Sequence, residues 1–209
     1  MTVVHVCAVT RNKSISATTL HTIMNIHMQC MMRGIHLDIA FVPDKSNLPR
    51  LIKSGERIIW LEYGTNLDEG SLVKAIMPFD KNLQVLVFPA VKEGINWDAF
   101  TKKTKAGSTE PVNQRGLDFD TVVGRKLADS LYEVTSTEAR VWAMDTKPVD
   151  KKLRGEKIPV KRPNDESMFR VLQGQGIRIG AVTSATVICH FVHECIGNIL
   201  ETTGVRLAP

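Results

Sequence analysis

The sequence contains no long hydrophobic run. Its longest apolar stretches, VLVFPAV at 85–91 and AVTSATVIC at 181–189, are far shorter than the roughly 20 residues that a membrane-spanning helix needs. The first residues also lack the basic segment, apolar core and small-residue cleavage site of a secretion signal. We therefore expect no membrane span and a cytoplasmic location.

Cysteine is scarce and shows no disulfide-framework spacing. The four residues lie in apolar contexts, which is typical of reduced thiols: Cys7, Cys30, Cys189 and Cys195. His190 and His193 lie between the last two, but no second Cys/His pair stands at ligand spacing elsewhere. The pattern therefore does not favour structural zinc.

Aromatic residues make up only 6% of the chain and are not interleaved with its positive charge. The net charge of +5 suits an anionic partner, and the basic residues concentrate at 102–105 and 147–162. Neither cluster carries a groove-binding motif, so nucleic acid is the less favoured partner. Solvated loops are the simplest interpretation of both clusters.

What the sequence does contain is an alternation of strands and helices. With 209 residues and 43% hydrophobic content, the chain is long enough for one substantial domain. Apolar runs and helical periodicity predict strands at 3–9, 36–42, 58–61 and 82–91, and helices at 16–33, 48–53 and 68–76. This order predicts a single α/β domain with a mostly parallel central sheet flanked by helices.

The second part of the chain is less regular. A long excursion through residue 115 is followed by a predicted helix at 117–131, a short strand at 132–136, an apolar segment at 138–144, and an exposed basic loop at 145–164. A helix at 165–173, a strand-like stretch at 177–189 and a closing helix at 190–204 complete the prediction.

Polar residues follow the first three predicted strands at the point where each ends. These are Thr10 to Asn12, Asp44 and Glu62. Because parallel strands end at one edge of a sheet, where ligands bind in open α/β folds, we expect these residues to converge on one cleft.

The order of these motifs resembles the nucleotide-sugar glycosyltransferases of the A-type (GT-A) fold, including small transferases of large DNA viruses. The matching stretches are AVTRN, VPDKS, IIWLEYG, NDESMF with GQGIRIG, and TSATVICH. The resemblance covers nearly the whole chain as an order of weak motifs. It implies a nucleotide-sugar-binding half at 1–91 and an acceptor-binding half at 92–209.

The resemblance also implies roles for individual residues. Those expected to hold the nucleoside part of the donor are Thr10, Arg11, Asn12, Asp44 and Tyr63. Glu62 and His190 would contact the diphosphate and its Mn²⁺ or Mg²⁺ ion. Trp97, in the long excursion, is a packing residue by default but could stack on a sugar.

Asp165 and Glu166 match the acidic pair that the family carries before an aromatic residue. In an inverting transfer, Glu166 would take the proton from the acceptor hydroxyl. Alternatively, both acids simply favour the first turn of a helix through its dipole.

One departure from the family concerns its Asp-x-Asp motif, which here reads Glu62-Tyr63-Gly64. One carboxylate could suffice where diphosphate oxygens complete the metal's ligands. Alternatively, the enzyme is independent of metal, or the chain is an inactive binding or structural protein on the same fold. A literal Asp-x-Asp at 118–120 follows a loop, and we interpret it as a pair at a helix N-terminus.

The sequence therefore predicts transfer of a sugar from a nucleoside diphosphate sugar to a hydroxyl group of a glycan or protein. The inactive binding protein is the competing prediction, and a nucleic-acid-binding protein is less favoured. The motifs do not identify the sugar, the base, the acceptor or the stereochemistry.

Overall fold

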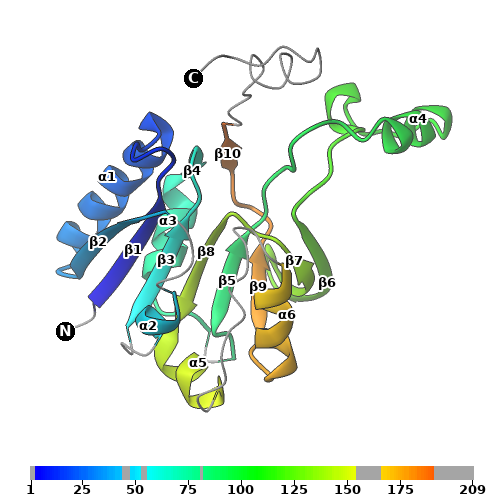
Figure 1. The fold of residues 1–209 in the computed structure, drawn as a ribbon. Coiled ribbons are helices and arrows are strands. Elements are labelled where there is room, and N and C mark those ends of the chain that lie inside the picture. The colour runs from blue at the N-terminus through cyan, green and yellow to red at the C-terminus, as the bar shows by residue number, and fades with distance from the viewer. Residues whose placement is uncertain (1–2, 44–47, 53–55, 81, 154–165, 191–209) are drawn as a thin grey trace, which may run out of the picture.

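The protein folds around one eight-stranded sheet. The computed structural model describes residues 3–43, 48–52, 56–80, 82–153 and 166–190 (Figure 1). The strand order is β2-β1-β3-β8-β5-β9-β7-β6. The bounds are β1 (Val3–Val9), β2 (His36–Val42), β3 (Arg57–Leu61), β5 (Val85–Phe88), β6 (Thr121–Ala128), β7 (Leu131–Thr137), β8 (Val141–Asp145) and β9 (Ile179–Val182).

The first part of the sheet is parallel, as predicted, and antiparallel pairs predominate in the rest. β2, β1 and β3 pair in parallel, and so do β5 and β9. β8 runs antiparallel between β3 and β5, and the β6–β7 hairpin extends the sheet beyond β9. Because β8 lies between two strands from the first 91 residues, the two halves of the chain share one sheet.

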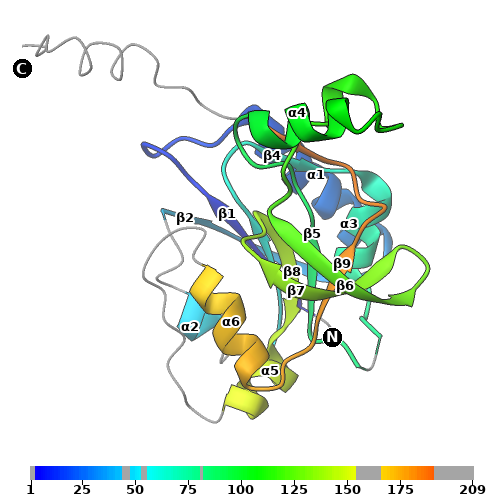
Figure 2. The same ribbon diagram turned by 90° about the vertical axis from the view of Figure 1, so that its right-hand side faces the viewer.

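Helices cover both faces of this sheet. α1 (Ala17–Met32) and α3 (Glu69–Ile76) pack on one face, and α2 (Leu48–Ile52), α5 (Thr146–Leu153) and α6 (Glu166–Gly174) pack on the other (Figures 1 and 2). In the part of the chain that the structure describes, no helix combines the length and apolarity needed to cross a membrane.

Local signals in the sequence explain where the helices of the first half begin. The Ser16 side chain caps α1 by accepting a hydrogen bond from the Thr18 backbone N–H at 3.3 Å. Asp68 caps α3 in the same way, through the Ser71 N–H at 3.0 Å. The predicted helix positions are confirmed here to within a few residues.

Aromatic packing joins the neighbouring strands β3 and β8 in the middle of the sheet. Trp60 on β3 and Trp142 on β8 are stacked, with ring centroids 5.6 Å apart, and Phe169 on α6 meets Trp142 edge-on at 6.2 Å. All three side chains are almost fully buried. This stack therefore fixes β3 against β8 and holds the first turns of α6 beside Trp142.

The excursion after β5 forms an arm that projects from the body of the protein (Figure 1). It contains α4 (Trp97–Lys105) and the short η2 helix (Val112–Gln114), and α4 buries none of its residues. Backbone hydrogen bonds close its base, including Lys92 N–H to Asp118 O at 2.8 Å and Asp120 N–H to Ala90 O at 2.9 Å. The arm thus leaves and rejoins the sheet at one point.

The helix predicted at 117–131 is wrong. This segment is instead β6 and the turn into β7, with Ser130 at a φ of 55°. The β-branched residues at 121–123 and Gly124 disfavour a helix. Consequently, Asp118 and Asp120 are not at a helix N-terminus.

Three other expectations need correction or fall outside the described residues. The exposed loop expected from residue 145 begins instead as α5, which buries Val149 and Leu153. The strand expected at 177–189 is split into β9 and β10 (Val187–Cys189). β10 pairs with a short unpredicted strand, β4 (Thr65–Leu67), in a second sheet. The helix expected at 190–204 lies outside the described residues beyond His190.

Candidate functional site

The ends of β1, β2 and β3 lie at the same edge of the sheet, here called the carboxyl edge. Val9 is in register with Val42, and Ala8 with Leu61. Thr10 and Glu62 therefore emerge side by side, which confirms the predicted convergence of these strand ends.

The antiparallel strand β8 begins at this edge. Its first residue, Val141, pairs with Leu61 on one side and Phe88 on the other. Arg140, directly before it, consequently lies at the carboxyl edge. Asp120 is held there too, because its backbone N–H donates to Ala90 O, just past the end of β5.

Glu62 is nearly buried, with 6% of its surface exposed. Its backbone N–H donates to Arg140 O at 3.0 Å, and its Oε1 accepts a hydrogen bond from Trp60 Nε1 at 2.9 Å. The Trp60–Trp142 stack therefore orients this carboxyl group. A side chain oriented in this way is better suited to a specific contact than an acid on a mobile loop.

Gly64 occupies the position of the second acid in the Asp-x-Asp motif that this segment resembles, and the structure explains why glycine is required. Its φ is +77°, and a Cβ at this position would lie 2.4 Å from the backbone oxygen of His190. The His190 N–H also donates to Gly64 O at 2.8 Å. No side chain fits here without displacing the end of β10.

His190 is consequently brought beside the Glu62 segment. Its backbone bonds to Gly64, and its Nδ1 forms a hydrogen bond with Thr18 Oγ1 at 3.0 Å. The Gly64 N–H in turn donates to Thr19 Oγ1 at 3.0 Å. The N-terminus of α1, the end of β3 and the end of β10 thus meet at one place.

Asp120, which the sequence analysis placed at a helix N-terminus, is a further candidate for the site. It is 6% exposed, and its Oδ1 accepts hydrogen bonds from the Ala90 N–H at 3.1 Å and Thr121 Oγ1 at 2.8 Å. Within the described residues, its buried Oδ2 has no hydrogen-bond partner. Burial raises the pKa of this carboxyl group, although these hydrogen bonds and the Arg140 charge act in the opposite direction.

The Asp-x-Asp at 118–120 was the feature of the sequence that could have pointed to Asp120. Its other acid, Asp118, is exposed, and its Oδ2 accepts a hydrogen bond from Asn96 Nδ2 at 2.9 Å in the arm. One acid of the pair therefore lies at the carboxyl edge, and the other holds the base of the arm.

Arg140 lies close enough to influence two neighbours at this edge. It is half-buried. Burial raises the pKa of the Cys189 thiol, which the Arg140 charge lowers and the Asp120 charge raises further. The Arg140 and Asp120 charges therefore both act on the Cys189 thiol, and the Arg140 charge also acts on the Asp120 carboxyl group.

The residues predicted to hold the nucleoside are only partly described. Thr10 is tied to β2 through its N–H and Val42 O at 2.8 Å, and the exposed loop after it turns through Asn12 and Lys13 at φ values of 49° and 61°. Arg11 and Asn12 belong to this loop, and Tyr63 is half-buried beside Glu62. Asp44 lies outside the described residues.

The predicted acid pair is also incompletely described. Asp165 lies outside the described residues, and Glu166 is the first residue of α6, with its side chain outside them. Phe169, three residues later, packs on Trp142. The start of α6 is thus anchored to the aromatic stack that orients Glu62, while the catalytic role of Glu166 stays a prediction.

The donor set fits a divalent ion only if another molecule supplies further ligands. The described segments contain no group of three acidic, histidine or cysteine side chains suited to a metal. However, Mg²⁺ is commonly held by one or two carboxylates together with substrate phosphates. Glu62 and Asp120, two carboxyl groups at one edge, match that number.

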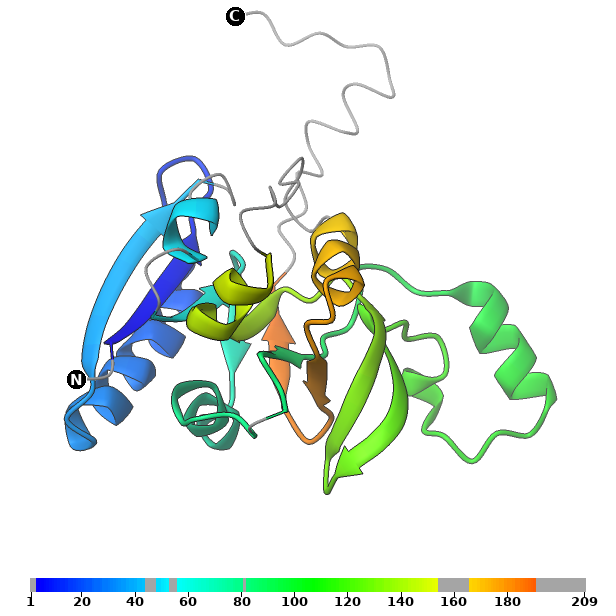
Figure 3. The same ribbon diagram turned by 90° about the horizontal axis from the view of Figure 1, so that it is seen from below.

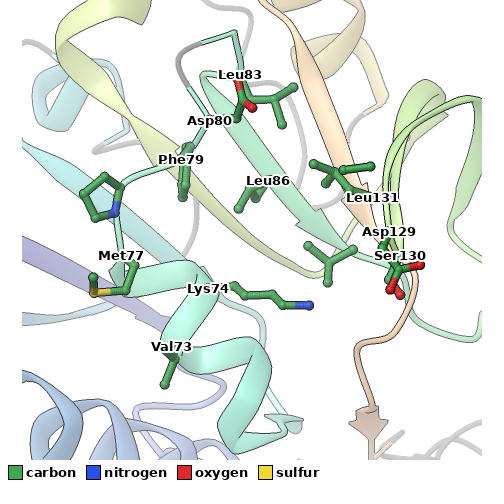
Figure 4. A pocket seen from close by; sticks show the side chains of 13 residues that line it. Val73, Lys74, Met77, Phe79, Asp80, Leu83, Leu86, Asp129, Ser130 and Leu131 are labelled. Carbon is green, nitrogen blue, oxygen red and sulfur yellow. The ribbon is translucent and has the colours of Figure 1, made fainter.

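A separate cavity of about 280 Å³ lies between α3 and the turn of the β6–β7 hairpin (Figure 4). Its walls are mainly apolar and include Met77, Phe79, Leu86 and Leu131. None of the candidate residues at the carboxyl edge lines this cavity.

No model of a protein family matches the sequence, and no curated protein does. Among solved structures, A197 from STIV is 12% identical, over 93% of this chain and 87% of that one, with a TM-score of 0.48. A glycosyltransferase involved in glycosylation of the major capsid of PBCV-1 is 10% identical, over 75% and 68% of the two chains, with a TM-score of 0.33.

The 4-diphosphocytidyl-2C-methyl-D-erythritol synthase from Anaerococcus prevotii DSM 20548 is also 10% identical. It covers 97% of this chain and 98% of its own, with a TM-score of 0.43. Similarities this weak leave the function of the chain to be inferred from its own residues.

Proposed function

We propose that the protein is a glycosyltransferase that binds a nucleoside diphosphate sugar at the carboxyl edge and transfers the sugar to a hydroxyl acceptor, a glycan or a protein. The observation that supports this proposal most is the convergence of Glu62, Asp120 and Arg140 from three distant segments. Open α/β sheets bind ligands at this edge. There, the Arg140 guanidinium would attract a diphosphate, and Glu62 and Asp120 would lie beside the diphosphate through a bridging divalent cation.

In this proposal, the loop after β1 and the end of β3 receive the donor. Thr10, Arg11, Asn12 and Tyr63, together with Asp44, would contact the nucleoside. The guanidinium of Arg140 would pair with the diphosphate, a group that its planar donor geometry matches well. His190 would lie on the other side of Glu62, bonded to Thr18.

Mn²⁺ or Mg²⁺ would be held by Glu62, with His190 or Asp120 nearby, together with diphosphate oxygens. When bound, such an ion neutralises charge on the departing diphosphate. Asp120 provides the second carboxyl group that Gly64 cannot provide.

The transfer itself needs a base for the acceptor. For an inverting reaction, we assign this role to Glu166, with Asp165 beside it. The acceptor oxygen would form the new bond to the anomeric carbon as the bond to the diphosphate breaks. The hydroxyl proton would pass to Glu166, and the bonding electrons would leave with the diphosphate.

Donor titration of the parent protein and Glu62→Gln, with and without Mn²⁺, tests the donor site. Glutamine can still accept the Trp60 hydrogen bond but carries no charge, so the fold should persist. We expect the Mn²⁺-dependent gain in donor affinity to fall roughly 10-fold or more. The matched control is Glu133→Gln, a half-exposed acid on β7 that pairs with Arg125 at 3.8 Å. Equal metal dependence in the parent, Glu62→Gln and the control would contradict the assignment.

Glu166→Gln tests the assigned base separately. Release of nucleoside diphosphate with candidate acceptors should fall by roughly 10²-fold or more, with donor affinity nearly unchanged. A residue that only favours the first turn of α6 would instead change the free energy of unfolding by about 0.3–1 kcal/mol and leave turnover intact. That second pattern would remove Glu166 from the mechanism.

A further inference from the structure

α1 has an unusual surface for a helix at the outside of a protein. None of its 16 residues is Asp, Glu, Lys or Arg. Its exposed side chains include Leu20 and four of the chain's eight methionines, Met24, Met28, Met31 and Met32. Helices on a protein surface normally place charged residues toward water, so this face resembles one that another surface covers.

Part of this face lies on the side of α1 toward β2. The other side of the helix is fixed, because Thr22 Oγ1 donates to Asn66 Oδ1 at 2.8 Å and Gln29 Nε2 donates to Glu69 Oε1 at 2.7 Å. At about 100° per residue, Leu20, Met24 and Met31 lie roughly opposite Thr22 and Gln29. They consequently point away from α3.

β2 extends this apolar surface. Ile39 and Phe41 are in register with Val6 and Ala8, which belong to the core cluster under α1. They therefore face the α1 side of the sheet, yet they are 36% and 54% exposed. Leu20, Met24, Met31, Ile39 and Phe41 together form what we call the α1–β2 face.

The two edges of the sheet differ in how they are protected against pairing with another strand. β2 forms one edge, at the left in Figure 3, and has seven residues in unbroken register with β1. Its only formally charged residue, Asp38, is bonded to His5 at 2.9 Å. β6, at the other edge, carries Arg125 and Lys126 and has three register shifts. Charges and irregular register are common protections of edge strands. β2 has no register shift, and its single charge, on Asp38, is paired with His5.

We infer that the α1–β2 face binds the same face of a second copy of this chain. Two β2 strands would pair antiparallel across a two-fold axis, and the apolar residues of α1, Ile39 and Phe41 would meet their counterparts. The α1–β2 face carries no formal charge, and the one charged residue of β2, Asp38, alternates with Ile39 and lies on the other side of the sheet beside His5. A two-fold contact therefore brings few like charges together despite the net charge of +5. An acidic partner would instead prefer the lysine clusters elsewhere in the sequence.

The size of this face fits a modest dimer. A 16-residue helix is about 24 Å long, and with the neighbouring strand the face measures roughly 24 Å by 20 Å, about 500 Å². Standard interfaces bury about 800 Å² per partner, and backbone pairing along β2 adds to the contact. We therefore expect association that depends on concentration.

Sedimentation velocity over a range of protein concentrations tests this inference, which does not depend on the proposed enzymatic function. The parent should approach twice the monomer mass of 23.3 kDa as concentration rises. Ile39→Lys and Met24→Glu should each shift the dissociation midpoint at least 10-fold toward higher concentration, because each places a charge in the contact. Both side chains are exposed, so thermal unfolding of the variants should confirm an intact fold.

Val122→Lys is the matched control, because Val122 is an exposed apolar residue on the opposite edge strand, β6. It should dimerise like the parent. A parent that stays monomeric at every concentration would overturn the inference. So would a dimer that Ile39→Lys and Met24→Glu leave unchanged, or one that Val122→Lys disrupts instead.

Discussion

The two parts of the sheet contribute to the carboxyl edge in different ways. In the parallel part, β2-β1-β3, only strand ends reach this edge, and they bring Thr10 and Glu62. In the mixed part, strand beginnings reach it as well, and they bring Arg140 before β8 and Asp120 before β6. The antiparallel strands thus add a cation and a buried acid that a fully parallel sheet would have placed elsewhere. The candidate site therefore spans the boundary between the parallel and the mixed part, where β3 pairs with β8.

The largest expected effect comes from removing the aromatic contact between β3 and β8. Trp142→Ala removes the ring that stacks on Trp60 and contacts Phe169, and we expect it to lower the free energy of unfolding by about 3–5 kcal/mol. Denaturant titration measures this loss. Trp97→Ala is the control, because Trp97 is 65% exposed in the arm, and it should change stability by less than about 0.5 kcal/mol. Similar losses for the two variants would show that the stack does not join the two parts.

A smaller effect is expected where the parallel part meets β10. Gly64→Asp would place an acid where the glycosyltransferases that the sequence resembles carry their second one, but the positive φ alone should lower the free energy of unfolding by about 1–3 kcal/mol, with more from the contact with His190. Gly174→Ala, where an added Cβ meets nothing within 4 Å, is the control and should be tolerated. If Gly64→Asp were as stable as the parent and bound Mn²⁺ more tightly, the account of Gly64 would be wrong.

The smallest effect concerns pH and the buried acid of the mixed part. Because burial raises the pKa of Asp120, the folded state holds its proton to higher pH than the unfolded state does. This contribution to stability is fully present below the ordinary carboxyl pKa of 3.8 and is lost as pH rises through the raised value. Asp120→Asn should flatten this part of the stability curve, as measured by denaturant titration across that pH range.

Asp118→Asn is the control for this pH dependence, since Asp118 is exposed two residues away. It should leave the slope of the parent curve unchanged. A slope that survives Asp120→Asn would assign the pH dependence to another group.

These differences also explain which features were predictable from the sequence. β1, β3 and α1 were recognisable because a strand buried on both faces is a continuous apolar run, and a capped helix has a periodic apolar face. β6 gave no such signal, because most of its residues are exposed on both faces. Its β-branched residues alone did not outweigh the helical interpretation.

The charged part of the site was harder to predict than the fold. Glu62 follows an apolar strand, so its position could be deduced locally. Asp120 is buried by a contact with Ala90, 30 residues away, and Arg140 reaches the edge only because β8 runs antiparallel. Such contacts depend on the tertiary pairing of strands, which spacing along the chain does not show. The glycine at position 64 likewise depends on the distant backbone of His190.

The central claim is that the carboxyl edge binds a nucleoside diphosphate sugar, and thermal unfolding with a panel of these donors tests it most directly. Donors with uridine, guanosine, cytidine and adenosine would each be measured with and without Mn²⁺, on the parent and on Arg140→Met. At 100 times its Kd, the correct donor should add about 2.7 kcal/mol to the free energy of unfolding of the parent, and clearly less in Arg140→Met at the same concentration. A parent that no donor stabilises, with or without the metal, would contradict the claim.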